Sequence, residues 1–206
     1  MKLFDYPPSG NGYKVRLALA LLNLPYHYVP VDILKGETRT PEFLRKNPNG
    51  RIPLLQLDDG GFLAESNAIL YYLAVGSALW PSARLEQAQV LQWLFFEQYS
   101  HEPYVATARF WVSIKKLEMN DENARLLAQK QTLGNAALRI MDEHLRSQSY
   151  LVGDRYTIAD IALYAYTHVA GEGGFDMSQY PAICAWLQRL ATQPRHVGID
   201  DWQPSA

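Results

Sequence analysis

The pattern of apolar residues changes once along this chain, near residue 77, and the change limits the folds that the chain can adopt. Over residues 1–76, short β-rich runs alternate with helical segments in the order β-α-β-α-β-β-α. Beyond the connector GSALWPSARLEQ, the patterns are helical. The sequence therefore predicts an α/β domain over residues 1–76, followed by an all-helical domain over residues 84–206.

The predicted elements follow from apolar spacing and from turn residues. Strands are expected at Lys2–Tyr6, Tyr26–Ile33, Arg51–Leu57 and Phe62–Glu65, with helices at Lys14–Leu24, Thr40–Asn47 and Ser66–Val75. The short turn DDGG predicts an antiparallel pair for the last two strands, whereas the helix between the first two predicts a parallel pair. In the second domain, helices are expected at Arg84–Lys116, Asp121–Ser147, Thr157–Gly171 and Tyr180–Gln193.

Charge and composition exclude several classes of partner. The net charge of −2 gives no basic surface for nucleic acid or an anionic membrane, and no apolar run approaches the ~20 residues of a membrane span. The single cysteine, Cys184, excludes an internal disulfide and is expected in the core, and no pair of histidines has the spacing of metal ligands. With no signal-peptide pattern at the start, we expect a soluble cytoplasmic protein without a bound metal.

The stretch YPPSGNGYK, residues 6–14, joins the first strand to the first helix. Ser9 or Asn11 can cap that helix, and its unpaired backbone N–H groups attract anions. A dinucleotide fingerprint fails because Val15 stands where the third glycine is needed, and a hydrolase nucleophile elbow fails because Pro7 and Asn11 flank the serine. From the residues alone, this turn is an anion-binding helix start or simply a capped helix.

Four stretches, in this order and at these distances, resemble motifs of the cytosolic glutathione S-transferases: SGNGYK, RIPLL, AESNAI and GDRYTIADI. The resemblance covers essentially the whole chain. It implies a thioredoxin-like N-terminal domain, an all-helical second domain, and transfer of the glutathione thiolate to a small hydrophobic electrophile. It also implies a two-fold homodimer, which would cover apolar side chains of the long helices such as Phe95, Phe96, Phe110 and Trp111.

The resemblance places the sulfur of glutathione at the first turn. Ser9 resembles the serine of theta-type and related bacterial members, where many other bacterial relatives have a cysteine. The hydroxyl of Ser9 would stabilise the thiolate, with Asn11 as a second donor or a brace, and which of the two contacts the sulfur stays open. The backbone beside Ile52–Pro53, whose peptide bond the family implies is cis, would pair with the cysteinyl backbone of glutathione.

The resemblance also assigns the two ends of glutathione. Ser66 and the N–H groups at its helix start would bind the γ-glutamyl carboxylate, and Glu65 would meet the γ-glutamyl ammonium. Lys35 would suit the glycine carboxylate. Each has a plainer alternative, because Ser66 can be an ordinary helix cap and Lys35 a solvated surface lysine.

The second-substrate pocket is expected on the helical domain, from Tyr99, His101 and Arg109. The alternative is that this helix serves the core or a dimer interface, with His101 as a satisfied interior histidine. Thr157 and Asp160, in contrast, have the spacing of a capping box and are expected to be structural.

Three functions remain open on the sequence. The first is a glutathione transferase. The second is a glutathione-dependent disulfide reductase or peroxidase, which the Ser-x-Asn pattern of Ser9 and Asn11 also resembles. The third is a non-catalytic binding protein on the same fold. The complete set of glutathione-site residues favours an enzyme over a binding protein.

Overall fold

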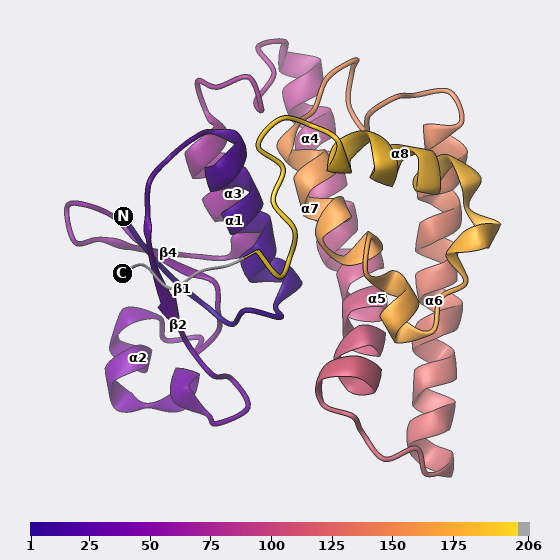
Figure 1. The fold of residues 1–206 in the computed structure, drawn as a ribbon, viewed down its shortest axis with the longest axis horizontal. Helices are drawn as coiled ribbons and strands as arrows, with labels where there is room; N and C mark the ends of the chain where they lie inside the picture. The colour runs from indigo at the N-terminus through magenta and orange to yellow at the C-terminus, as the bar shows by residue number, and fades with distance from the viewer. Residues whose placement is uncertain (202–206) are drawn as a thin grey trace. The chain divides into compact units, whose positions relative to one another are not determined.

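The structure is a computed structural model that describes residues 1–201, and its contacts divide the chain into two compact units. The first unit comprises Met1–Ser77 together with residues 194–201, and the second comprises Ala78–Gln193. As predicted, the first unit is α/β and the second is helical (Figure 1). The assignment of the C-terminal segment differs, because residues 194–201 pack with the first unit and not with the helical one.

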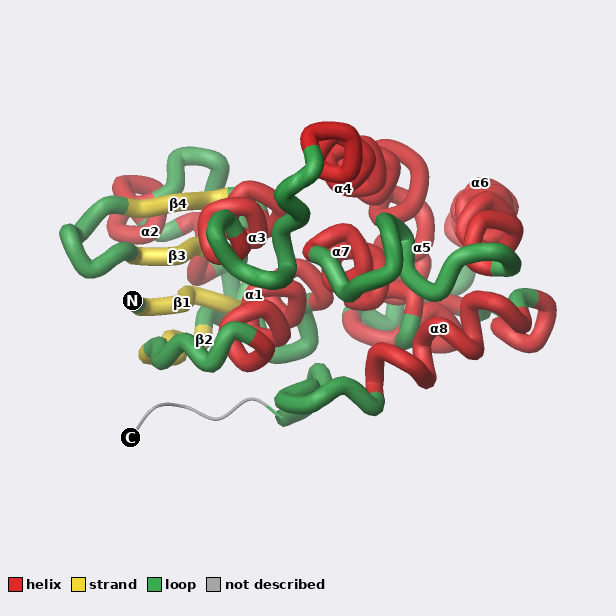
Figure 2. Tube along the Cα trace, turned by 90° about the horizontal axis from the view of Figure 1, so that it is seen from above, coloured by secondary structure: helices red, strands yellow, loops and turns green. Residues whose placement is uncertain are grey.

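A four-stranded sheet forms the centre of the first unit, in the order β2-β1-β3-β4 (Figure 2). The strands are β1 (Lys2–Asp5), β2 (His27–Pro30), β3 (Leu54–Gln56) and β4 (Phe62–Ala64). The predicted parallel pairing of β1 with β2 and antiparallel pairing of β3 with β4 are confirmed. The strands are shorter than predicted. Proline has no N–H to donate to a strand ladder, and β2 ends at Pro30 while β3 begins directly after Pro53.

The two faces of the sheet have different occupants. Phe4 and Leu54 form a core cluster with Phe43 of α2 (Pro41–Lys46), and the rings of Phe4 and Phe43 meet edge to face at 6.4 Å. Leu3 and Leu55, one residue along each strand, are also fully buried but point to the opposite face. Helices α1 (Gly10–Leu21) and α3 (Ser66–Ala74) pack against each other beside the sheet, which completes the thioredoxin-like arrangement (Figure 1).

Two helix starts test the capping predictions. Thr40 caps α2 by accepting a hydrogen bond from the backbone N–H of Phe43 at 3.2 Å, and Pro41 is the first helical residue, both as predicted. Helix α1, however, begins at Gly10 and not at Lys14. The prediction ended the turn too late because two glycines disfavour a helix, whereas capping by Ser9 stabilises the first turn in spite of them.

The second unit is built around α7 (Ile158–Thr167), in which every residue is buried. It packs against α4 (Arg84–Phe96) and α5 (Glu102–Arg109), while α6 (Asp121–Leu145) packs against α5 and α8 (Pro181–Ala191). The predicted capping box at the start of α7 is confirmed: the side chain of Asp160 accepts from the backbone N–H of Thr157 at 2.9 Å. Because every residue of α7 is buried among these helices, this unit has a core of its own.

The helix predicted over Arg84–Lys116 is helical from Arg84 to Ile114, but its hydrogen-bond pattern is not α-helical throughout. A π-helical turn at Glu97–His101 separates α4 from α5, and a second one follows α5 at Phe110–Ile114. The first interruption lies just before Pro103, which has no backbone N–H to continue the α-helical pattern. Tyr99 and His101, both predicted site residues, lie in this interruption.

Cys184 was predicted to be buried and is exposed. Helix α8 buries Ile183, Trp186 and Leu190, which share one face at helical spacing, so that Cys184 falls outside that face. Over residues 1–201, none of the helices has the length and apolar character needed to cross a membrane.

Candidate functional site

The β1–α1 turn, residues 6–12, places a hydroxyl at the N-terminus of α1. Ser9 has an extended backbone, and its Oγ accepts a hydrogen bond from the backbone N–H of Gly12 at 3.2 Å. Its own N–H donates to the carbonyl of Tyr6 at 2.8 Å, which closes the turn. Of the two predicted caps, Ser9 fills the role. A helix N-terminus with a half-buried hydroxyl beside it is suited to bind an anion.

Gly12 is required by what lies beside it. A Cβ atom at this position would lie 1.5 Å from Oδ1 of Asp5, which is far inside any allowed contact. Asp5 is the last residue of β1 and is fully buried. No local pattern in the sequence reveals that a carboxylate from the preceding strand fills the space beside Gly12.

The structure brings Asn11 and Ser66 together. Oγ of Ser66, at the start of α3, donates to Oδ1 of Asn11 at 3.1 Å. Nζ of Lys14 donates to the same Ser66 oxygen at 3.4 Å, and Lys14 is fully buried. A buried ammonium group needs polar partners, and the Ser66 hydroxyl is one that the start of α3 supplies. The sequence analysis missed Lys14, since a lysine in an amphipathic helix usually faces solvent.

Glu65 has an unusual backbone conformation. It immediately precedes α3 with φ of 68° and ψ of 114°, in a region that residues other than glycine rarely adopt. Its side chain makes no capping bond and the residue is exposed. Strain of this kind persists where the surrounding structure fixes it and clusters at binding sites. Glu65 is therefore an exposed residue in a strained conformation, directly before the start of α3.

The Ile52–Pro53 peptide bond is cis, as the resemblance implied. Pro53 is buried and immediately precedes β3, so the backbone at Ile52 lies just beyond the paired part of the strand. The side chain of Asn47 supports this segment, because its Nδ2 donates to the carbonyl of Arg51 at 2.8 Å.

Lys35 is apart from these contacts. Its side chain is 76% exposed and its Nζ lies 3.1 Å from Oδ2 of Asp32. The hydrogen bond from Lys35 is the main reason that the pKa of Asp32 lies below its usual value. Lys35 is therefore a surface lysine in an ion pair, and the structure gives it no contact with the other predicted residues.

The predicted residues of the helical unit have different surroundings from one another. Tyr99 is 80% exposed. His101 is fully buried, and its Nε2 lies 3.0 Å from Oγ1 of Thr167. That hydroxyl donates to the carbonyl of Leu163 at 2.6 Å, so Nε2 of His101 is the donor to Thr167. Arg109 is 6% exposed, and its Nε lies 2.8 Å from Oε2 of Glu172. Only Tyr99 among the three offers an exposed side chain.

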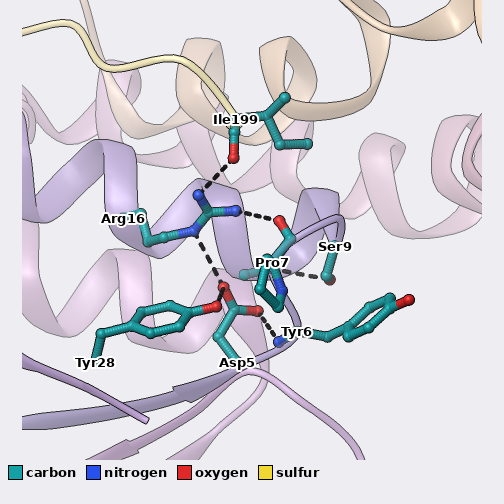
Figure 3. Close-up of polar contacts among 8 residues, drawn as sticks. Asp5, Tyr6, Pro7, Ser9, Arg16, Tyr28 and Ile199 are labelled. Carbon is teal, nitrogen blue, oxygen red and sulfur yellow. Dashed lines mark hydrogen bonds and ion pairs between the residues drawn. The ribbon is translucent and has the colours of Figure 1, made fainter. Parts of the chain in front are cut away.

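Beneath the β1–α1 turn lies a buried ion pair that no sequence motif indicated (Figure 3). Oδ2 of Asp5 accepts from Nε of Arg16 at 3.1 Å and from the Tyr28 hydroxyl at 3.4 Å, while Oδ1 accepts from the backbone N–H of Tyr6 at 2.7 Å. Burial raises the pKa of Asp5 to about 7, against the lowering effect of Arg16. Asp5 ends a strand and Arg16 lies in the helix that follows, 11 positions along the chain, so no spacing rule within one element pairs them.

No group of three or more His, Cys, Asp or Glu side chains within residues 1–201 is arranged to hold a metal ion. The chemistry that the first unit offers is that of anion binding. Ser9 caps the N-terminus of α1, while the N-terminus of α3 at Ser66 has no side-chain cap and lies beside the buried Lys14 side chain.

Family models match residues in both units of the chain. Residues 1–75 match the glutathione S-transferase N-terminal domain, and residues 91–194 match the glutathione S-transferase C-terminal domain. The chain is 32% identical to the disulfide-bond oxidoreductase YfcG of Escherichia coli, over 92% of this chain and 89% of that protein.

Solved structures extend the likeness to three dimensions. A glutathione S-transferase from Pseudomonas fluorescens superposes with a TM-score of 0.94 and 54% identity, over 97% of this chain and 98% of that one. The glutathione transferase URE2P8 from Phanerochaete chrysosporium, with oxidized glutathione, superposes with a TM-score of 0.83 and 26% identity, over 94% and 90% of the two chains. The protein described here belongs to the glutathione S-transferase family.

Proposed function

We propose that this protein is a glutathione transferase whose β1–α1 turn stabilises the glutathione thiolate. The observation that supports this most is the hydrogen bonding of Ser9. Its oxygen accepts from the backbone N–H of Gly12, so the hydroxyl proton can be donated to a sulfur anion at the N-terminus of α1. Ser9 is not the base, because its hydroxyl is far less acidic than a thiol.

The energies are sufficient for this role. A free thiol has a pKa near 8.5, and lowering it by about two requires about 2.7 kcal/mol. A helix N-terminus contributes ~0.3–1 kcal/mol, and up to ~2 kcal/mol when partly buried. One hydroxyl hydrogen bond to the charged sulfur adds ~1.5–3 kcal/mol. The helix end and Ser9 together reach the required value, whereas the helix end alone does not.

The second helix start would hold the γ-glutamyl end of glutathione. Ser66 and the first N–H groups of α3 would bind the carboxylate, with the buried ammonium of Lys14 below them, and Glu65 would meet the ammonium group. Asn11 accepts from Ser66, so it links this end to the β1–α1 turn and remains the alternative contact of the sulfur.

The peptide backbone and the glycine end of glutathione have their own partners in this proposal. The backbone beside Ile52–Pro53 would pair with the cysteinyl residue, and Lys35 would meet the glycine carboxylate through solvent-exposed charge. For the electrophile, exposed Tyr99 is the best candidate contact, while His101 and Arg109 would act from buried positions.

A second activity has support of its own, because a relative 32% identical is a disulfide-bond oxidoreductase. In such a reaction, the bound glutathione thiolate attacks one sulfur of a disulfide and expels the other as a thiolate. A second glutathione then resolves the mixed disulfide, which yields two thiols and oxidised glutathione. The same thiolate site serves both reactions, so the second substrate decides between them.

The test is glutathione binding by calorimetry, followed by parallel assays with an aryl halide and with a small symmetric disulfide. We expect binding, and faster turnover of the aryl halide. Faster turnover of the disulfide would assign the reductase activity. Binding with no turnover in either assay would favour the non-catalytic function, and absence of glutathione binding would reject the whole proposal.

We also propose that the protein forms a two-fold homodimer. Large apolar side chains are exposed on α3 and on α4 through the π-helical turn: Tyr71, Tyr72 and Val75, and Leu85, Leu91, Phe95 and Tyr99. Exposure of so many large apolar side chains to water is unfavourable in a single chain, whereas their burial at an interface would stabilise a dimer. Sedimentation should give twice the mass of one chain, and a mass near 23.4 kDa at micromolar concentration would contradict the dimer.

A further inference from the structure

The guanidinium of Arg16 joins the end of β1 and the turn that follows it to a C-terminal residue that is 183 positions away along the chain (Figure 3). Nε donates to Asp5 at the end of β1, Nη2 donates to the carbonyl of Pro7 at 2.7 Å, and Nη1 donates to the carbonyl of Ile199 at 2.7 Å. Arg16 is 2% exposed. A simple ion pair would need only the carboxylate, but here two further donors hold backbone carbonyls, which a planar guanidinium can do and an ammonium group cannot.

The contacts on one side fix the start of the β1–α1 turn. Asp5 accepts from the N–H of Tyr6, and Arg16 donates to the carbonyl of Pro7, so both ends of this two-residue stretch are held by the ion pair. The carbonyl of Tyr6 in turn accepts from the N–H of Ser9. The position of the Ser9 hydroxyl therefore depends on the Asp5–Arg16 pair.

The contacts on the other side fix the C-terminal segment. The hydroxyl of Tyr13, one helical turn before Arg16, donates to the carbonyl of Val197 at 2.7 Å. Since its proton is used there, Nε2 of His196 at 3.3 Å is the donor to the Tyr13 oxygen. Tyr13 is fully buried and Ile199 is 9% exposed, so α1 and this segment form a packed contact.

We propose that Arg16 is a positioning residue that couples the C-terminal segment, residues 196–199, to the β1–α1 turn and so to Ser9. One guanidinium holds both, so a shift of the group that breaks the bond to Ile199 also changes its bonds to Asp5 and Pro7. Residues 196–199 are thus a working part of the glutathione site although none of them is proposed to contact glutathione. The catalytic consequence rests on the proposed function, and the structural coupling does not.

Two variants separate the ends of this coupling. Arg16→Lys keeps the charge beside Asp5 but cannot reach both carbonyls. Tyr13→Phe removes only the hydroxyl that contacts the C-terminal segment, and it keeps the backbone hydrogen bond of 2.9 Å from the Tyr13 N–H to the Ser9 carbonyl. Lys46→Gln, which breaks an ion pair with Glu42 on the surface of α2, is the matched control.

The first readout is hydrogen exchange without any ligand. In Arg16→Lys, the amides of Ser9 and Gly12 should exchange about tenfold faster, and in Tyr13→Phe they should exchange at least about threefold faster, with amides of β3 unchanged in both. Faster exchange confined to residues 196–199 would overturn the coupling. Since no glutathione is present, this result stands whether or not the protein is a glutathione transferase.

The second readout is the pKa of bound glutathione, from thiolate absorbance. Arg16→Lys and Tyr13→Phe should raise this pKa and lower kcat with little change in the KM for glutathione, while Lys46→Gln matches the wild type. If the variants unfold at a lower temperature but keep the wild-type pKa of bound glutathione and the wild-type kcat, Arg16 has only a structural role, and the proposed positioning of Ser9 is contradicted. A wild-type protein that binds no glutathione would reject the proposed function and leave the exchange result to decide the coupling.

Discussion

Asp5 in the first unit and Asp160 in the second are both fully buried, and burial raises the pKa of both, to about 7 and to about 6. They differ in what they hold. Asp160 accepts from Leu151 N, Thr157 N, Thr157 Oγ1 and Trp186 Nε1, all neutral donors of the helical unit. Asp5 is paired with a cation, and its partners fix the β1–α1 turn.

This difference separates structural from functional polarity. Burial, raised pKa and satisfied hydrogen bonds are common to both carboxylates, so none of these properties identifies a functional site alone. The partners do so: Asp160 joins a loop, a helix cap and α8, whereas Asp5 lies in van der Waals reach of Gly12 in the turn that presents Ser9. Changes at Asp160 should therefore affect folding, and changes around Asp5 should affect chemistry.

The largest effect is expected from Asp160→Ala. Removing the carboxylate leaves several buried donors without an acceptor, each at a cost of ~1–3 kcal/mol, so the free energy of unfolding should fall by about 3 kcal/mol or more. Urea unfolding measures this fall. Asp176→Ala is the control, since that carboxylate also caps a short helix but is solvent-exposed. If the urea midpoint of Asp160→Ala lies as close to the wild-type midpoint as that of Asp176→Ala does, Asp160 has no structural role of this size.

Gly12→Ala should come next. Its Cβ would lie 1.5 Å from Oδ1 of Asp5, and a buried ion pair has little room to move. Overpacking costs ~1–3 kcal/mol, and we expect a loss of about that size together with loss of glutathione turnover. Gly171→Ala is the control, because nothing lies within 4 Å of its added Cβ. An active Gly12→Ala protein of wild-type stability would show that the turn does not depend on the carboxylate.

Sequence reasoning reached the parts of this site that local rules encode. Capping of α2 by Thr40, the capping box at Asp160 and the strand pairing follow from neighbours along the chain, and the structure confirms them. The sites of Lys14 and Gly12 depend on residues from other elements, so no pattern indicated them. The prediction that Cys184 is buried was wrong for a related reason. Which residues of α8 are buried depends on the face that the neighbouring elements cover.

The pH dependence of stability gives a third test, with an effect that is spread over several pH units. Because the pKa of Asp5 is raised from 3.8 to about 7, the folded state retains a proton that the unfolded state has released between these values. The free energy of unfolding should thus decrease as the pH rises from about 4 to about 7, by at most about 1.4 kcal/mol per pH unit from this residue. In Asp5→Asn this contribution should vanish.

Urea unfolding at several pH values compares the two proteins. Asp160, whose pKa is also raised, contributes a decrease of the same sign at lower pH, up to about 6, and this part should remain in Asp5→Asn. The slopes of wild type and Asp5→Asn should therefore differ from about pH 4 to about pH 7, because the Asp160 contribution is common to both proteins, and above about pH 6 only the wild type should keep losing stability from these two residues. Parallel curves across the whole range would mean that Asp5 keeps an ordinary pKa.

The smallest effect is expected from Lys35→Ala. The side chain is 76% exposed and its ion pair with Asp32 is on the surface, so the unfolding midpoint should not change measurably. If Lys35 meets the glycine carboxylate of glutathione, the KM for glutathione should rise, by no more than about fivefold. An unchanged KM for glutathione would show that Lys35 does not contact the glycine carboxylate.

The most direct test of the central claim is the titration of glutathione bound to wild type, Ser9→Ala and Asn11→Ala, followed by thiolate absorbance. Loss of one hydrogen bond to the sulfur should raise the pKa of bound glutathione by about one to two in Ser9→Ala, and by less in Asn11→Ala. Turnover of Ser9→Ala should accordingly fall more below that pKa than above it. If the pKa of bound glutathione shifts in Asn11→Ala alone, Asn11 is the residue that contacts the sulfur. If both variants keep the wild-type pKa, the β1–α1 turn does not stabilise the thiolate.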